Sequence, residues 1–209
     1  MNKKDYYLSN EKTGSFVKVR DNNSIFYGGN QQWYKNKRRV VNGCGPVAGA
    51  NILAYLSNKD DKYANLYNEE NFSKENFVKF QESIYDLIKP SPLGLININH
   101  FIKRIIQYGI SKGVDLSYKK LGFNDRNFTY LSSYTFIRNA LMKDIPVVVF
   151  NLDLRRDFLF RWHWMVITRI YAEDGEIKLV LSSWGKRYVI DFDRLFSSMR
   201  MGGGMVYFY

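Results

Sequence analysis

Residues 43–56 read GCGPVAGANILAYL, a stretch with the pattern of a helix. Apolar side chains recur on one helical face, at Ala48, Ile52 and Tyr55. Pro46 falls in the first turn, where a missing N–H costs nothing. The pattern therefore predicts a helix that begins at Cys44 and runs to about residue 56.

Downstream of this helix, two kinds of periodicity follow one another. Apolar residues at helical spacing predict helices over about 74–88, 99–111 and 133–143. After residue 144, β-branched and aromatic runs predict strands at 146–150, 162–171, 177–182, 188–190 and 205–209. A hairpin turn is expected at 173–176 and a helical turn near 191–198. Helices followed by an antiparallel sheet indicate an α+β protein.

The length and composition favour one domain. The chain has 209 residues and 45% hydrophobic content, which is enough to bury one core. Residues 1–42 are polar and irregular, with a turn signal at Gly28-Gly29-Asn30. We therefore expect a single domain over 1–209, with an irregular N-terminal segment at about 1–42. A mostly helical lobe follows at 43–143 and a sheet lobe at 144–209.

The cysteine and histidine counts exclude several kinds of site. One cysteine excludes an intramolecular disulfide, and with only two histidines it excludes the four-ligand zinc patterns. We expect no metal and no cofactor. No apolar run is long enough for a membrane span, and the first residues lack the pattern of a secretory signal. The localisation stays open, with the cytoplasm as the default.

Positive charge is in excess, with 31 Lys and Arg against 20 Asp and Glu, a net charge of +11. Such an excess attracts acidic partners, so one remains an option. The only dense run, KNKRR at 35–39, is interpreted as a solvated loop face. No spaced series of stacking aromatic residues accompanies it, so nucleic acid is not expected as a partner.

Cys44 lies where a thiol can become reactive. Unpaired N–H groups and about half a positive charge at a helix start lower the pKa of a thiol there. Gly43 and Gly45 remove Cβ atoms from the approach to the sulfur. The alternative is that Cys44 is only a small buried side chain. A base is also needed, and His163, near the start of a strand, fits better than His100, on the polar side of a helix.

Four short segments resemble a known family when they are taken together and in order. They are Gly43–Ala48, Pro146–Val149, His163–Val166 and Ser183–Gly185. They resemble the papain-like cysteine peptidases, and most closely the bacterial branch that includes the double-glycine leader peptidases. The resemblance covers about residues 30–190. His163 follows Cys44 by 119 residues, a shorter interval than the roughly 130–150 of the papain type.

The resemblance implies a papain-like fold, with Cys44 as nucleophile and His163 as general base and acid. The family's imidazole-orienting asparagine corresponds to Ser182, a departure from the family pattern. In a paired strand, one register turns Ser182 toward His163 and the other turns Ser183, so Ser183 stays an alternative. Asp191 and Asp193 remain candidates at longer range, although a helix-capping role explains Asp191 more simply.

The family also holds the oxyanion with a glutamine upstream of the cysteine. Arg38 occupies the usual place, some six residues before Cys44. An insertion carrying KNKRR would bring Gln32 into that role, with Gln31 as the alternative.

The favoured interpretation is a cysteine-dependent hydrolase that cleaves an amide bond of a peptide or protein substrate through a thioester at Cys44. Transfer of the acyl group to an amine uses the same dyad and stays open. A second hypothesis is a catalytically impaired papain-like module that binds peptides. A third is a basic polyanion-binding protein in which the cysteine is structural.

Overall fold

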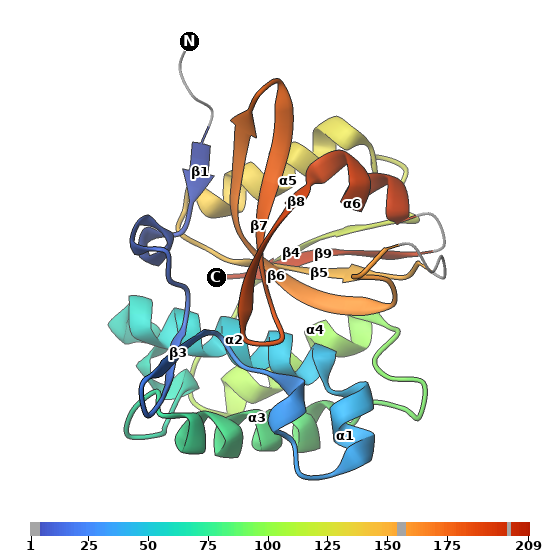
Figure 1. Ribbon diagram of the computed structural model, residues 1–209. Coiled ribbons are helices and arrows are strands. Elements are labelled where there is room, and N and C mark those ends of the chain that lie inside the picture. Colours follow the sequence, from blue (N-terminus) through green and yellow to red (C-terminus); the bar gives the residue numbers. More distant parts are fainter. Residues whose placement is uncertain (1–4, 154–157, 200–201) are drawn as a thin grey trace.

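The computed structural model describes residues 5–153, 158–199 and 202–209. Helices pack on both faces of a central antiparallel sheet (Figure 1). On one side lie α1 (Lys37–Asn42), α2 (Cys44–Lys59), α3 (Lys74–Ile88) and α4 (Ile98–Ser111). On the other side lie α5 (Tyr130–Leu141) and α6 (Phe192–Ser198). The α+β class expected from the sequence is confirmed.

The sheet has seven strands within the described residues. They are β1 (Asp5–Tyr7), β4 (Tyr118–Gly122), β5 (Val147–Asn151), β6 (His163–Glu173), β7 (Glu176–Ser183), β8 (Lys186–Asp191) and β9 (Gly203–Phe208). Their order is β4-β9-β5-β6-β7-β8, and β1 pairs with the far end of β6. The expected helices and the strands after residue 144 are therefore confirmed, with small shifts at their ends.

The prediction of an irregular segment over residues 1–42 was wrong. That segment contains β1, the hairpin of β2 (Lys18–Asp21) and β3 (Ser24–Tyr27), the short 3₁₀ helices η1 (Ser9–Thr13) and η2 (Gln31–Trp33), and α1. These elements are too short for periodicity to reveal them. Strand β4 also lies within the span expected to be mostly helical. It was not predicted, because its side chains at 118–120 are exposed and carry no strand-like apolar pattern. A further short helix, η3 (Asp61–Leu66), follows α2.

Residues 37–39 of the basic run at 35–39 form the start of α1, which corrects the interpretation of the whole run as a loop, although residues 35–38 are exposed as expected. Asn36 caps this helix, because its side chain accepts a hydrogen bond from the Arg38 N–H. Arg39 is paired with Glu82 and lies 2.7 Å from Asp86 of α3. Part of the positive charge of the run is thus neutralised within the fold.

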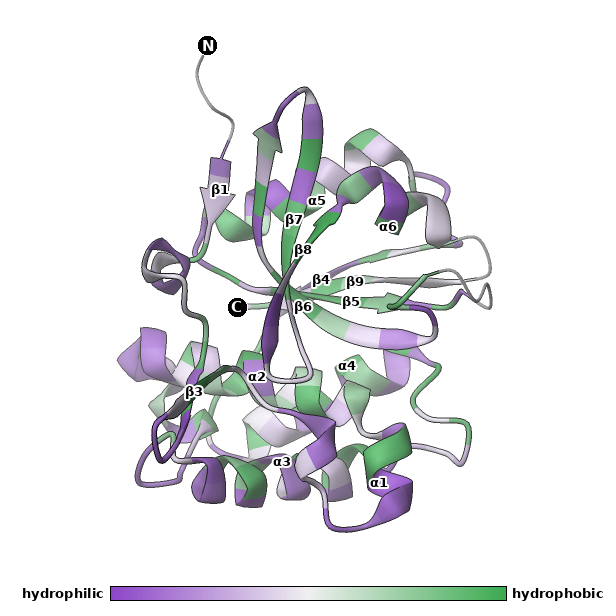
Figure 2. Cartoon of the chain, viewed as in Figure 1, coloured by the Kyte–Doolittle hydropathy of each residue, from purple (hydrophilic) through white to green (hydrophobic). Residues whose placement is uncertain are grey.

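One apolar cluster joins the helices to the sheet. Figure 2 shows hydrophobic residues concentrated in the central strands and hydrophilic ones on the outer surfaces. α2 is buried on nearly every side from Gly45 to Leu56, so it runs through the centre of the helical layer. Its N-terminus, with Cys44, is therefore held firmly against β6.

β6 contains a bulge that changes its register. In the hairpin with β7, Arg169 pairs with Val180, but Ile167 pairs with Leu181, so Thr168 is the extra residue. The bulge lies where the neighbour of β6 changes from β5 to β1. A one-residue slip exchanges the two faces of a strand, so this bulge decides which β7 side chains face His163.

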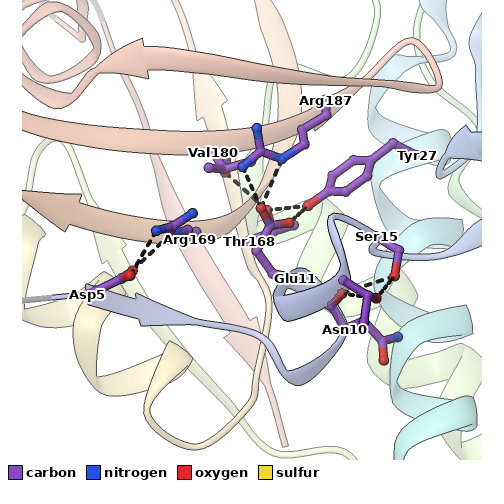
Figure 3. A network of polar contacts seen from close by, with 10 residues as sticks. Asp5, Asn10, Glu11, Ser15, Tyr27, Thr168, Arg169, Val180 and Arg187 are labelled. Atoms are coloured by element: carbon purple, nitrogen blue, oxygen red, sulfur yellow. Dashed lines mark hydrogen bonds and ion pairs between the residues drawn. The ribbon is translucent and has the colours of Figure 1, made fainter. Parts of the chain in front are cut away.

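Buried polar residues hold the N-terminal segment against this bulge (Figure 3). The Tyr27 hydroxyl donates to the carboxylate of Glu11 and lies 2.8 Å from Thr168 Oγ1. Arg187 of β8 donates to Glu11 Oε1 from Nε at 2.9 Å and from Nη2 at 2.6 Å. A buried carboxylate requires such partners, so Glu11 links η1, β3 and β8, and Tyr27 extends the network to β6.

Candidate active site around Cys44

Cys44 is the first residue of α2, reached through a tight connection at Gly43 from the end of α1. Its side chain is half-buried. The two flanking glycines are needed for packing within the chain. A Cβ on Gly43 would come within 2.4 Å of the Tyr34 ring, and one on Gly45 within 2.6 Å of Leu95. The contacts give both glycines a packing role beside the one expected from the sequence.

His163 opens β6 and is buried, with 6% of its surface exposed. Its Nε2 atom lies 2.6 Å from Ser183 Oγ on β7. The ring stacks on Trp184, with centroids 4.2 Å apart and planes 22° apart. Phe160 stacks in turn on Trp184, with ring centroids 5.6 Å apart. The imidazole is therefore fixed in orientation by one hydrogen bond and one aromatic face.

The two tryptophans that flank His163 in the sequence do not enclose it. Successive side chains of a strand point to opposite faces. The Trp164 indole N–H accordingly donates to Leu95 O at 2.5 Å, and Trp164 stacks on Phe150. Trp162 is 38% exposed. The aromatic rings next to the imidazole are those of Trp184 and Phe160 instead.

A small pocket brings most of the expected site residues together. Its lining includes Gln31, Cys44, Asn51, His163, Ser182, Ser183 and Trp184. The pocket volume is about 10 Å³, which is room for a single water. No amino-acid side chain would fit inside this pocket.

The structure places Ser183, and not Ser182, against the imidazole. Ser182 points the other way, and its hydroxyl donates to Tyr27 O at 2.6 Å. It fills the space next to Gly28, whose φ of +94° and lack of a Cβ allow the close approach. Ser182 still lines the pocket, but it makes no hydrogen bond to His163 among the described residues.

Of the two candidate glutamines, only Gln31 lies at the pocket. Gln31 lines the pocket, and its amide Nε2 donates to Val40 O at 2.7 Å. Gln32 is exposed on the far side of the same 3₁₀ turn, which Asn30 caps. The structure thus brings the alternative, Gln31, to the site and leaves Gln32 in solvent.

The remaining candidates lie elsewhere in the fold. A ring nitrogen of His100 is 2.8 Å from Ile88 O, at the end of α3. Asp191 is 2.5 Å from Lys178 Nζ and directly precedes α6. Asp193 accepts a hydrogen bond from Tyr130. None of the three lines the pocket that contains Cys44.

Burial disfavours the charged forms of the Cys44 thiol and the His163 imidazole. It raises the pKa of the Cys44 thiol above the ordinary 9.0, although the backbone N–H groups of Trp164 and Gly45 partly offset the shift. It lowers the pKa of His163 to about 3. At neutral pH the resting pair is therefore a thiol and an uncharged imidazole.

Two residues of the site were missed as functional candidates by sequence reasoning. Trp184 has a φ of 48° in the turn between β7 and β8, which is unusual for a bulky residue and places its ring on His163. Asn51, about two turns into α2, is 2% exposed and accepts a hydrogen bond from Gly29 N at 2.7 Å. A buried asparagine inside an apolar helix was the available signal for the second.

No protein-family model matches the chain, and no curated protein matches it. Among the described residues, no helix has the length and apolar character to cross a membrane. The same residues contain no group of three or more His, Cys, Asp or Glu side chains placed to hold a metal ion.

Proposed function

We propose that this chain is a cysteine-dependent hydrolase that cleaves an amide bond in a peptide or protein substrate. The observation that carries the proposal is one pocket lined by Cys44 at a helix start and by His163, whose ring is oriented by Ser183. The resemblance of four ordered segments to papain-like cysteine peptidases supports a papain-like arrangement. In it, a helix presents the nucleophile and an antiparallel sheet presents the imidazole.

The neutral resting pair suggests how the reaction would begin. With the ring proton on Nε2, donated to Ser183 Oγ, Nδ1 carries the lone pair that can act as base. It would take the thiol proton as the sulfur attacks the carbonyl carbon, and then return that proton to the leaving amine. The product of this half-reaction is a thioester at Cys44. Water, deprotonated by the same nitrogen, would release the acid and restore the thiol.

The test is acyl transfer to Cys44. The chain is incubated with p-nitrophenyl acetate, and acetylation is located by peptide mapping with mass spectrometry. We expect rapid acetylation and turnover at Cys44 and none in Cys44→Ser at that position. His163→Ala should be slower by about 100-fold or more, the usual contribution of a general base. His100→Ala is the matched control and should match the unmodified chain.

Equal acetylation rates in His163→Ala and the unmodified chain would refute the proposal. If acetylation requires His163, a peptide library then identifies the scissile bond, and added amines distinguish hydrolysis from acyl transfer.

A second function, peptide binding without turnover, is favoured by one observation. The Gln31 amide nitrogen already donates to Val40 O, so one of its two N–H groups is not free to hold an oxyanion. This function predicts no acetylation at Cys44 but saturable binding of peptides in the same library.

A further inference from the structure

A cavity of about 670 Å³ lies at the opposite end of α2 from Cys44. Sites for small molecules commonly have volumes of about 300–1,000 Å³. The cavity reaches Asn58, which follows Cys44 by fourteen residues, or about 21 Å along the helix. It is therefore separate from the pocket of the proposed hydrolase.

Strand β2 turns two cations toward this cavity. Val19 is fully buried and points into the core. Its neighbours Lys18 and Arg20 therefore point the other way, and both line the cavity. The strand is fixed to the opposite wall, because Arg20 N donates to Phe72 O at 2.9 Å. The two cations thus project from a rigid edge, about 6.6 Å apart along the strand.

Neither of these cations is neutralised by the fold. Among residues 5–153, 158–199 and 202–209, no ion pair joins Lys18 or Arg20 to a carboxylate. The nearby Lys74, by contrast, lies 2.6 Å from Asp21. Glu70 is the only acidic residue in the described lining, so the cavity carries an excess of positive charge.

The rest of the lining suits a small polar ligand. Thr13, Asn58 and Asn71 supply hydroxyl and amide groups. The floor is aromatic, with the Phe16 and Tyr55 rings stacked 5.2 Å apart. At the edge, the Ser15 hydroxyl donates to Asn10 O at 3.0 Å, a bond that holds the turn in shape (Figure 3). The walls are therefore ordered before any ligand arrives.

We propose that this cavity binds a small anionic molecule through phosphate or carboxylate groups held by Lys18 and Arg20. Both side chains are strong charge-assisted donors to such groups. The site is independent of Cys44 and of the proposed function.

Isothermal titration calorimetry with pyrophosphate and with citrate, at about 0.15 M salt, tests the proposal. We expect saturable binding of at least one probe to the full chain. Tighter binding of pyrophosphate would assign phosphate groups to the ligand, and tighter binding of citrate would assign carboxylates. The double variant Lys18→Gln/Arg20→Gln should weaken binding by about tenfold or more.

Two further variants separate a built site from general attraction to a basic protein. Lys35→Gln/Lys119→Gln removes the same charge from exposed positions outside the cavity and should leave the affinity unchanged. Asn58→Trp fills the cavity without changing the charge and should weaken binding by about tenfold or more. Absence of binding to the unmodified chain would overturn the proposal. So would an equal loss of affinity in the two double variants.

Discussion

Cys44 and His163 are neutral in the resting chain because the same burial disfavours the charged form of each. A preformed thiolate would need the imidazolium beside it, and the imidazole is difficult to protonate where Trp184 covers it. In the proposed reaction, the thiol would therefore lose its proton only as the sulfur attacks the carbonyl carbon.

The first prediction concerns alkylation of Cys44. Because burial raises the pKa of the thiol, iodoacetamide should label the folded chain slowly at neutral pH. Labelling should become fast only above about pH 9, whereas the chain unfolded in urea should show an ordinary thiol pKa. Mass spectrometry measures the rate without ambiguity, because the chain has one cysteine. Fast labelling of the folded chain below about pH 7 would instead indicate a preformed ion pair.

The second prediction concerns stability at mild acidity. The pKa of His163 is about 3 in the folded chain and about 6.5 in an unfolded one. Between these values the unfolded chain binds more protons, so stability is complete above about pH 6.5 and falls as the pH drops toward 3. This residue alone should reduce the free energy of unfolding by up to about 1.4 kcal/mol per pH unit.

Urea unfolding at about pH 7, 6 and 5 measures this slope. The variant His163→Gln cannot titrate in this range and should show a flatter dependence. If both chains lose stability equally per pH unit, the imidazole is accessible to protons in the folded state.

Among the elements, β6 decides the geometry of the site, because its bulge at Thr168 sets which β7 residue meets His163. The pairing of Arg169 with Val180 near the turn would, if continued, have turned Ser182 toward the imidazole. After the bulge, Val166 pairs with Ser182, and Ser183 faces His163. The bulge is held in place by the buried contacts of Thr168 with Tyr27 and Val180.

The third prediction tests those contacts. Thr168→Val keeps the shape of the side chain but removes its hydroxyl, which lies 2.8 Å from the Tyr27 hydroxyl. We expect the free energy of unfolding to fall by about 1–3 kcal/mol, as measured by urea denaturation. Thr135→Val, a half-buried position on α5, is the matched control and should change it by less than about 0.5 kcal/mol. Equal effects would mean that the buried hydroxyl does not support the bulge.

Sequence reasoning located the elements that carry the site better than the register between them. The span 74–88 predicted for α3 agrees with Lys74–Ile88, because its apolar stripe is clear. The bulge in β6 was not predictable, because both faces of this strand are buried from Trp164 to Ile167. Such a strand shows a continuous apolar run, without the alternation that would reveal an extra residue.

No feature of the sequence favoured Gln31 over Gln32 as the glutamine of the pocket. The 3₁₀ turn at Gln31–Trp33 decides which glutamine points inward, and a three-residue turn leaves no periodicity to analyse. The helix α1 between this turn and Cys44 was mistaken for a loop because its exposed face is strongly basic. The residues of the pocket were thus identifiable as a set, while their individual orientations required the fold.

In the whole molecule, the candidate site is assembled from two layers that share one core. Cys44 comes from the helical layer, and His163 and Ser183 come from the sheet. The apolar cluster continues from α2 and α4 into β5, β6 and β7 without a boundary. The relative position of Cys44 and His163 is therefore maintained by the packing of both layers. A second, much smaller apolar cluster, formed by Tyr34, Val47 and Tyr85, lies within the helical layer.

This continuity leads to the last prediction. Leu179 of β7 is fully buried, so Leu179→Ala should lower the free energy of unfolding by about 2–5 kcal/mol. Because the layers share a core, the loss should reach the helices as well. Tryptophan fluorescence comes from Trp162, Trp164 and Trp184 in the sheet half and from Trp33 in η2. It should give a midpoint that shifts together with that of far-ultraviolet circular dichroism, which follows the helices. Leu131→Ala, at a position 72% exposed, should shift neither. A shift confined to the fluorescence would show that the helical layer folds on its own, and that the distance between Cys44 and His163 varies as the layers separate.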